Sequence, residues 1–501
     1  MITIKNIATR ALLTGATGLF CSFFTLNSLA GIPIEQWTQA SGAQVYLVQS
    51  PGIPMVDVQI DFDAGSRRDP SDKAGLAGVT ASMTGKGVLA GKSATEPALD
   101  ENALSEAWAD LGASFGGGAS TDRMSFSLRS LTYPDLLPKA VALAARQLGE
   151  PAFPQAVWQR ERETLNASIR ESNTRPATLA GRAFGAAVYG LHPYGYETTQ
   201  ETLARISVAD MQALYSRLIV PCRAKVTLVG AVNRAQADAL VTQLLARLPS
   251  SAPSACPALP AVADVAPLSK PVEQRIAFDS AQAHVLIGQP GFKRDDPDFF
   301  ALTVGNYILG GGGFVSRLTE EVRQKRGLSY SVYSYFAPGL HAGAFTVGLQ
   351  TRPDQADQAV KVSREVVAQF VAEGPTPAEL QAAKDNLIGG FALRRFFQAL
   401  VQFFFGFALF GAVAVAALLP VVRRKCHGVM SLYRSVGPGR GRFTVRLASR
   451  KGFEPLTPGL GNYVTDRRSI AELCKLLDRD QHPTRHHSYS KADPALLVLG
   501  I

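Results

Sequence analysis

The sequence predicts an α+β protein built from two related half-domains, each a mixed sheet packed with helices. Short runs that alternate apolar and polar residues, typical of half-buried strands, are interspersed with longer runs of helical periodicity. The order of strand, polar turn and helix begins again after a stretch rich in proline, serine and alanine at residues 250–271. A repeated order of this kind predicts two domains of one fold.

The first half is expected to open with strands around Gln44–Gln49 and Met55–Asp63, followed by the polar turn GSRRDPSDKAG. A series of helices comes next, and the half closes on a strand and a helix. These later elements are predicted around Leu76–Met83, Glu101–Leu111, Tyr133–Gln147 and Gln155–Ser172, then Lys225–Val229 (strand) and Ala235–Leu248 (helix).

The second half repeats this beginning, with a strand at residues 283–289, the polar turn GFKRDDPD and a helix over Phe299–Leu309. The stretch VRQKRGLSYSVYSYF predicts a helix that ends at Gly327 and a strand that runs to Phe336. A strand over Gly343–Leu349 and a helix over Pro353–Ala372 follow. No closing strand and helix can be recognised after about residue 400, so the second half is expected to be incomplete.

Composition describes a globular chain whose basic charge is confined to one end. The 501 residues are 46% hydrophobic and 18% charged. From Arg394 onward there are 17 basic and 6 acidic residues, whereas the 393 residues before it hold 34 basic and 35 acidic ones. The main body therefore gives no reason to expect nucleic acid as a partner.

An apolar segment, residues 396–422, precedes the basic tail 423–501 and carries no charged residue. Its length suits a membrane span followed by positive residues on the cytoplasmic side. The same abrupt loss of pattern is expected from a change of reading frame near residue 394, which would replace the end of the domain with unrelated sequence. Both interpretations stay open from the sequence.

The N-terminus is typical of an export signal. Lys5 and Arg10 precede an apolar run, and Ser28-Leu29-Ala30 supplies small residues for cleavage after residue 30. We therefore expect a periplasmic protein, with a membrane anchor only if residues 396–422 span a bilayer. Cys222 and Cys256 are the cysteines of the body, and their spacing alone leaves open whether they pair.

The predicted domains follow from these boundaries. They are a signal peptide at 1–30, a first domain at 31–249, a linker at 250–271, a second domain at 272–395, the apolar segment 396–422 and the tail 423–501.

Several stretches, in order, resemble the pitrilysin/insulinase family of zinc peptidases, in the branch of mitochondrial processing peptidase. They are DAGSRRDPSDKAGLA, RERETLNASIRE, LHPYGYETT, VTLVGAV and GGGGFVSRLTEEVRQKRGLSYSVYS, within residues 32–393. The resemblance implies two related half-domains that form a clamshell around a peptide. It also implies a turn role for His192 and an exposed strand within residues 113–130 that pairs with substrate backbone, with an ordinary inner strand after a glycine turn as the alternative. The glycine run Gly310–Gly313 allows close backbone approach and is expected to shape the chamber wall, to form a flexible loop at a helix start, or both.

The residues needed for zinc are missing. Active members carry H-x-x-E-H on a helix, two histidine ligands with a glutamate base between them. The matching positions here are Gly78, Ala81 and Ser82, and Ser168 stands where a downstream helix supplies a glutamate ligand. These side chains cannot hold zinc or take a proton from a zinc-bound water. We expect no metal or other cofactor on this chain and no peptidase activity from it alone.

Other residues could be considered as replacement ligands. Glu163 and Glu171 lie near Ser168, but no imidazole accompanies them. His284 and His341 are isolated, and each is expected to be a satisfied structural residue.

A second pair of residues does match the family. Arg323 and Tyr330 stand seven residues apart in the second half, where the family has an Arg/Tyr pair that reaches the substrate held at the zinc of the opposite half. The guanidinium and the phenol can donate hydrogen bonds to a peptide carbonyl and to the oxyanion that forms on attack.

The resemblance therefore implies a zinc-free subunit of a two-chain metallopeptidase. A partner bearing H-x-x-E-H would hold the zinc, and this chain would contribute Arg323 and Tyr330 to peptide binding. The alternative is an inactive scaffold or peptide-binding protein of the same fold. A third interpretation is a nonfunctional product, because an unfinished half-domain would expose apolar surface.

Overall fold

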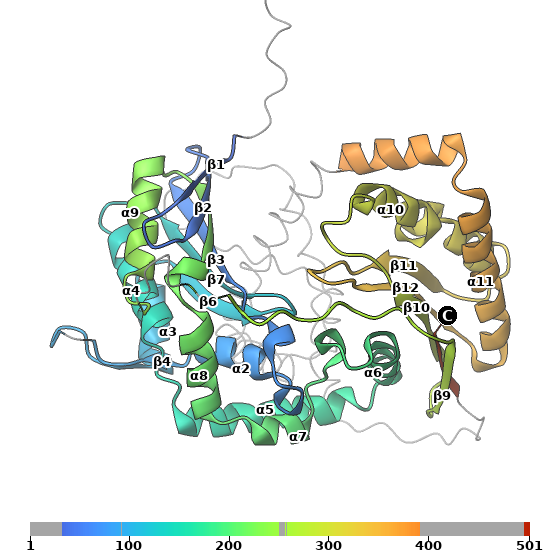
Figure 1. Ribbon diagram of the computed structural model, residues 1–501, viewed down its shortest axis with the longest axis horizontal. Coiled ribbons are helices and arrows are strands. Elements are labelled where there is room, and N and C mark those ends of the chain that lie inside the picture. The colour runs from blue at the N-terminus through green and yellow to red at the C-terminus, as the bar shows by residue number, and fades with distance from the viewer. Residues whose placement is uncertain (1–32, 92, 250–255, 257, 391–494, 501) are drawn as a thin grey trace, which may run out of the picture. The chain divides into compact units, whose positions relative to one another are not determined.

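The computed structural model describes residues 33–91, 93–249, 256, 258–390 and 495–500, which form two mixed sheets with their helices (Figure 1). Both sheets belong to one compact unit, and residues 381–390 are the described part of a second unit. The predicted signal peptide 1–30, the apolar segment 396–422 and the tail 423–501, apart from one strand at its end, lie outside the described residues.

The first sheet has six strands in the order β1-β2-β8-β3-β7-β6. Their alternating sequences bury one face; in β3, Val56, Val58, Ile60 and Phe62 point into the core while the residues between them do not. The strands are β1 Glu35–Thr38, β2 Gln44–Gln49, β3 Met55–Phe62, β6 Ser114–Ala119, β7 Met124–Leu131 and β8 Lys225–Gly230, with a small ribbon of β4 Gly87–Val88 and β5 Leu99–Asp100.

Helices of the first half contribute to the core that covers this buried face. Three of them begin with reciprocal caps, in which Thr199, Ser207 and Asn233 accept from backbone N–H groups one turn further on. The helices are α2 Leu76–Met83, α3 Glu101–Asp110, α4 Leu137–Gly149, α5 Gln155–Ser172, α6 Pro176–Tyr189, α7 Gln200–Arg205, α8 Val208–Leu218 and α9 Arg234–Leu245.

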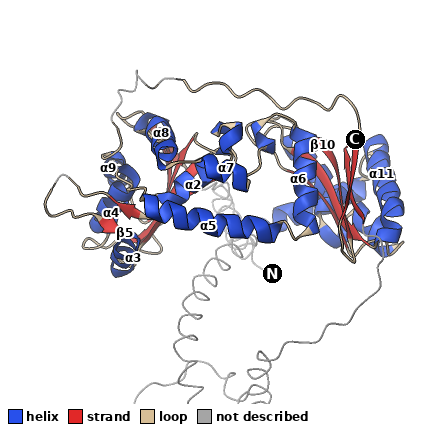
Figure 2. Ribbon diagram, turned by 90° about the horizontal axis from the view of Figure 1, so that it is seen from below, coloured by secondary structure: helices blue, strands red, loops and turns tan. Residues whose placement is uncertain are grey.

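The second sheet has five strands in the order β11-β12-β10-β13-β9. Helix α11 packs on one face, and α6 of the first half packs on the other through Phe184 (Figure 2). The elements are β9 Val272–Ala277, β10 Ala283–Pro290, α10 Phe299–Asn306, β11 Ser331–Phe336, β12 Ala344–Thr351, α11 Ala356–Glu373, a helix over 377–390, and β13 Ala495–Gly500.

The two sheets share one plan, which confirms the predicted α+β class with related halves. In the first sheet β2 and β3 are separated by the last strand of that half, β8, and in the second β9 and β10 are separated by β13. A hairpin, β6–β7 or β11–β12, forms one edge of each sheet. The direction of the last strand differs. β8 runs parallel to β2 and antiparallel to β3, whereas β13 runs antiparallel to β9 and parallel to β10.

The second half therefore receives, from the far end of the chain, a strand at the position that β8 has in the first sheet, but in the opposite direction. Within the described residues it also lacks counterparts of α8 and α9, which complete the first core. Helix α10, whose sequence FFALTVGN is mostly apolar, has no buried residue, and Phe300 is 79% exposed. These features agree with a half that is incomplete.

Most predicted elements coincide with the structure, and the differences have local causes. The helix expected from Tyr133 begins at Leu137, because Tyr133 O accepts a turn hydrogen bond from Leu136 N. The helix expected over Phe299–Leu309 is α-helical only to Asn306 and continues as a π-helix, Tyr307–Gly311, into the glycine run.

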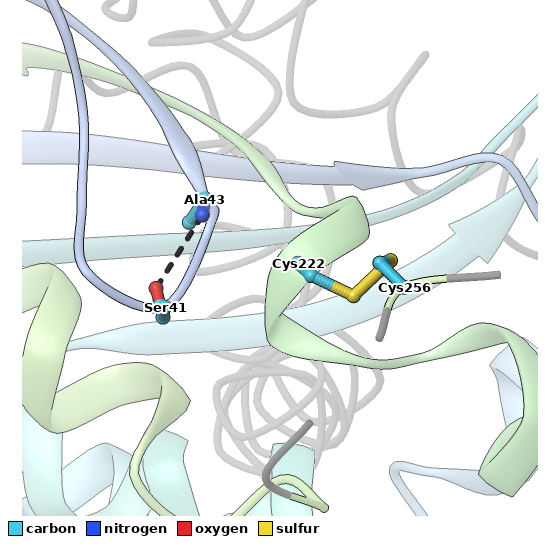
Figure 3. Close-up of a disulfide and its surroundings, with 4 residues drawn as sticks. All are labelled: Ser41, Ala43, Cys222 and Cys256. Atoms are coloured by element: carbon cyan, nitrogen blue, oxygen red, sulfur yellow. Dashed lines mark hydrogen bonds between the residues drawn. A yellow bond between two sulfur atoms is a disulfide. The ribbon is translucent and has the colours of Figure 1, made fainter. Parts of the chain in front are cut away.

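A disulfide joins Cys222, in the short 3₁₀ helix Pro221–Arg223, to Cys256 in the linker, 34 residues later (Figure 3). The pairing that the sequence left open is thus present. The described linker residues 258–271 form no helix or strand. No helix in the described part of the chain is long and apolar enough to cross a membrane.

Candidate substrate groove and degenerate zinc site

The four positions aligned with zinc-site residues, here called the degenerate zinc site, are Gly78, Ala81, Ser82 and Ser168. Gly78 and Ser82 lie on the exposed side of α2, and Ser168 is exposed on α5. Ala81, the position of the base, is only 1% exposed. A zinc ion needs nitrogen, sulfur or carboxylate ligands, and these residues do not fit it. Among the described residues, no group of three or more His, Cys, Asp or Glu side chains could hold a metal.

The carboxylates near α2 are used in ion pairs. Lys86, just after α2, contacts Glu101 of α3 at 2.6 Å and Glu161 of α5 at 3.1 Å, and Arg160 also contacts Glu101 at 2.6 Å. Hydrogen bonds from Lys86 and Arg160 lower the pKa of Glu101. Glu171, considered above as a replacement ligand, pairs with Arg175. This network joins three helices and leaves these carboxylates engaged in pairing.

A groove in the second half, with a volume of about 420 Å³, brings Arg323 and Tyr330 together. One wall is the continuous segment Tyr330–Tyr335, which is β11 and the residue before it. The other wall carries the glycine run, Phe314, Thr319 and Arg323. We call this the β11 groove.

Arg323 contacts two aromatic rings in this groove. Its guanidinium carbon lies 4.7 Å from the ring centroid of Tyr330 and 4.7 Å from that of Phe314. Tyr330 is 81% exposed and lies in the bend before β11 rather than inside the strand as expected. The sequence did not predict a role for Phe314, because nothing in its local pattern distinguishes a groove residue from an ordinary loop aromatic.

Local backbone geometry places Arg323. It lies in a π-helix, Thr319–Gln324, and the chain leaves this helix through a turn at Gly327, which has φ +61°. Gly327 N donates to Arg323 O and Leu328 N donates to Val322 O, so the helix end is capped as the sequence predicted. Buried Val322 and Leu328 anchor the two sides of this turn in the second core.

The glycine run is needed for close approach. A Cβ at Gly310 would lie 2.5 Å from the backbone nitrogen of Ser334 in β11, so only glycine lets the π-helix reach the strand.

An acidic residue near Arg323 in the same helix is paired with other cations: Glu321 contacts Lys325 at 2.7 Å and Arg326 at 2.6 Å. Within the described residues, Arg323 has no ion-pair partner, and its donors remain for a ligand.

A second groove, of about 470 Å³, follows β6 in the first half, and we call it the β6 groove. β6 is the edge strand of its sheet and falls within the stretch 113–130 that the resemblance assigns to substrate backbone. Gly116 and Gly118 face open space, with no atom within 4 Å of a Cβ built on either. On the neighbouring strand β7, Ser125 and Ser127 line this groove with small hydroxyl side chains.

A polar cluster that sequence reasoning missed joins the first half, the linker and the second half. His192 has the expected turn role, since its Nδ1 accepts from Tyr194 N at 3.1 Å. Tyr194 Oη donates to Asp122 at 2.7 Å, and His341 pairs with Asp264 of the linker at 2.9 Å. His341 is therefore satisfied, as predicted, and this cluster is structural.

Comparison with known proteins decides the family. Residues 44–202 match the model of the insulinase family, peptidase family M16, and residues 205–387 match that of the peptidase M16 inactive domain. The chain belongs to the M16 peptidase family. A solved structure described as a peptidase M16 inactive domain, from Pseudomonas fluorescens, is 34% identical, with a TM-score of 0.65, over 71% of this chain and 84% of that one.

Other relatives span both descriptions, peptidase and non-peptidase. An uncharacterized zinc protease of Streptomyces coelicolor is 28% identical, and the match covers 51% of this chain and 56% of that protein, so the chain spans about half of its length. A protein of Helicobacter pylori described as a non-peptidase homolog is 26% identical over 68% of this chain and 76% of that protein. The inactive-domain match and the non-peptidase homolog, together with the degenerate zinc site, support a non-catalytic protein of the M16 fold.

Proposed function

We propose that this M16 chain is the zinc-free subunit of a two-chain metallopeptidase, and that it holds peptide substrate for a partner that bears H-x-x-E-H. The observation that carries the proposal is the β11 groove, in which Arg323 and Tyr330 converge. A chain that cannot bind zinc has no catalytic need for this pair unless the metal comes from a partner.

Arg323 and Tyr330 supply the interactions that peptide hydrolysis needs on the substrate side. The guanidinium offers N–H donors, and the phenol offers one O–H donor, to a peptide carbonyl whose oxygen gains charge during attack. Contact with the Tyr330 and Phe314 rings restricts the guanidinium, so less conformational entropy is lost when a peptide binds. The β6 groove, with its free edge and glycines, would pair with extended peptide backbone.

Export is part of the proposal. The N-terminal sequence has the pattern of a signal peptide, and the Cys222–Cys256 disulfide supports an oxidising compartment such as the periplasm.

A second candidate is an inactive scaffold or peptide-binding protein of the same fold. The relative described as a non-peptidase homolog favours it. The two candidates differ in one property, which is whether cleavage by a zinc-bearing partner depends on Arg323.

The test is a pull-down of the mature protein from its own envelope extract, followed by a peptide-cleavage assay with and without a zinc chelator. Arg326→Ala is the matched control for Arg323→Ala, because Arg326 lies three residues away, is exposed and pairs only with Glu321 on its own helix. We expect chelator-sensitive cleavage that falls by about 100-fold in Arg323→Ala, the loss typical of one oxyanion donor, and stays unchanged in Arg326→Ala. A stable partner without cleavage, or equal cleavage in both variants, would support the scaffold.

A further inference from the structure

The β11 wall of the groove carries two tyrosines. Tyr333 and Tyr335 lie on the same face of β11, with ring centroids 6.0 Å apart and ring planes 22° from parallel. Both remain exposed, at 42% and 45%. The Tyr333 ring lies over Gly348 of β12, since a Cβ there would meet the ring at 2.4 Å. The glycine thus lets the ring lie flat against the sheet.

The edge of β11 is already occupied, which sets this groove apart from the one along β6. Asn306 Nδ2 donates to Ser334 O at 3.2 Å, and Ser334 Oγ donates to Asn306 Oδ1 at 2.7 Å. Gly310 also presses against this strand. A peptide cannot add as a further strand across this point, so recognition here must use side chains.

The remaining surface of the groove combines exposed rings with one cation. Phe314 and Tyr330 are 69% and 81% exposed, and both contact Arg323. A soluble protein seldom exposes this many neighbouring rings without a ligand to cover them. Ring faces and a guanidinium without a carboxylate partner complement a ligand that has an aromatic side chain next to a hydrogen-bond acceptor.

We propose that Tyr333 and Tyr335 are specificity-determining residues, which select peptides that carry an aromatic side chain close to the carbonyl held by Arg323. The inference rests on the proposed function, because it assigns the substrate class of that same groove. Selectivity would then be divided between the two halves. The β6 groove takes backbone of any sequence, and the β11 groove chooses the side chain.

The test measures peptide binding to the purified chain alone, by fluorescence anisotropy. The probes are two labelled eight-residue peptides of glycine and serine, one with two central phenylalanines and one with serines in their place. Each ring contact is typically worth a few-fold in affinity, so the phenylalanine peptide should bind about tenfold more tightly. In Tyr333→Ser/Tyr335→Ser the preference should fall below about threefold.

Two controls separate this inference from loss of fold and from the proposed function. Tyr133→Ser removes a ring of similar exposure, 47%, in the first half and should keep the preference. Arg323→Ala should weaken both peptides and also keep the preference. Equal binding of the two peptides by the unaltered chain, or a preference that survives in the double variant, overturns the inference. A preference that persists while cleavage ignores Arg323 overturns only the two-chain peptidase.

Discussion

Removing the disulfide should destabilise the first half by an amount that its loop length determines. Cys222 and Cys256 are 34 residues apart, and the loop they close contains β8 and α9, both part of the first core. Chain-entropy arithmetic for a loop of this size gives about 3.8 kcal/mol of stabilisation at 25 °C. For a chain of 501 residues, that free energy corresponds to a fall in Tm of about 4 °C.

The assay is thermal unfolding of Cys222→Ser/Cys256→Ser beside the unaltered protein, each with and without a reducing agent. We expect the reducing agent to lower the Tm of the unaltered protein to that of the double variant, and to leave the variant unchanged. If the variant melts within about 2 °C of the oxidised protein, the loop is already restricted in the unfolded chain, and the entropic reasoning is wrong.

Three further outcomes are expected. Trp158→Ala should lower the free energy of unfolding in urea by about 3–5 kcal/mol, because this side chain is 1% exposed. Trp158→Phe should lower it by only about 1 kcal/mol, for the lost hydrogen bond to Ile206 O, and equal losses in the two variants would contradict this reasoning. Hydrogen bonds from Arg317 lower the pKa of Glu379 to about 2. Their contribution to the free energy of unfolding, about 1 kcal/mol, should be complete above the ordinary pKa of 4.5 and lost as the pH falls toward 2. Arg317→Ala should remove this pH dependence. Metal analysis after dialysis against zinc should find no stoichiometric zinc, and chelator-sensitive loading would show a site other than the degenerate zinc site.

Much of the fold could be predicted because its causes are local. The strand Gln44–Gln49 and the helices Leu76–Met83 and Gln155–Ser172 were predicted to the residue, since alternation and helical periodicity are read within one element. Helix α6 was not predicted. Its Ala180, Phe184 and Val188 are buried against the second sheet, which lies far along the chain. No pattern within residues 176–189 predicts that contact.

The candidate site divides in the same way. The missing zinc ligands and the spacing of Arg323 and Tyr330 are properties of the amino-acid sequence. Glycine, alanine and serine lack the imidazole, thiolate and carboxylate groups that bind zinc, whatever the fold. Only the tertiary structure decided three other features. They are the contact of Phe314 with Arg323, the packing of the Tyr333 ring over Gly348 and the Cys222–Cys256 pair. Each depends on residues that packing brings together from separate parts of the chain. The free energy of such contacts cannot be predicted from the spacing of those residues in the sequence.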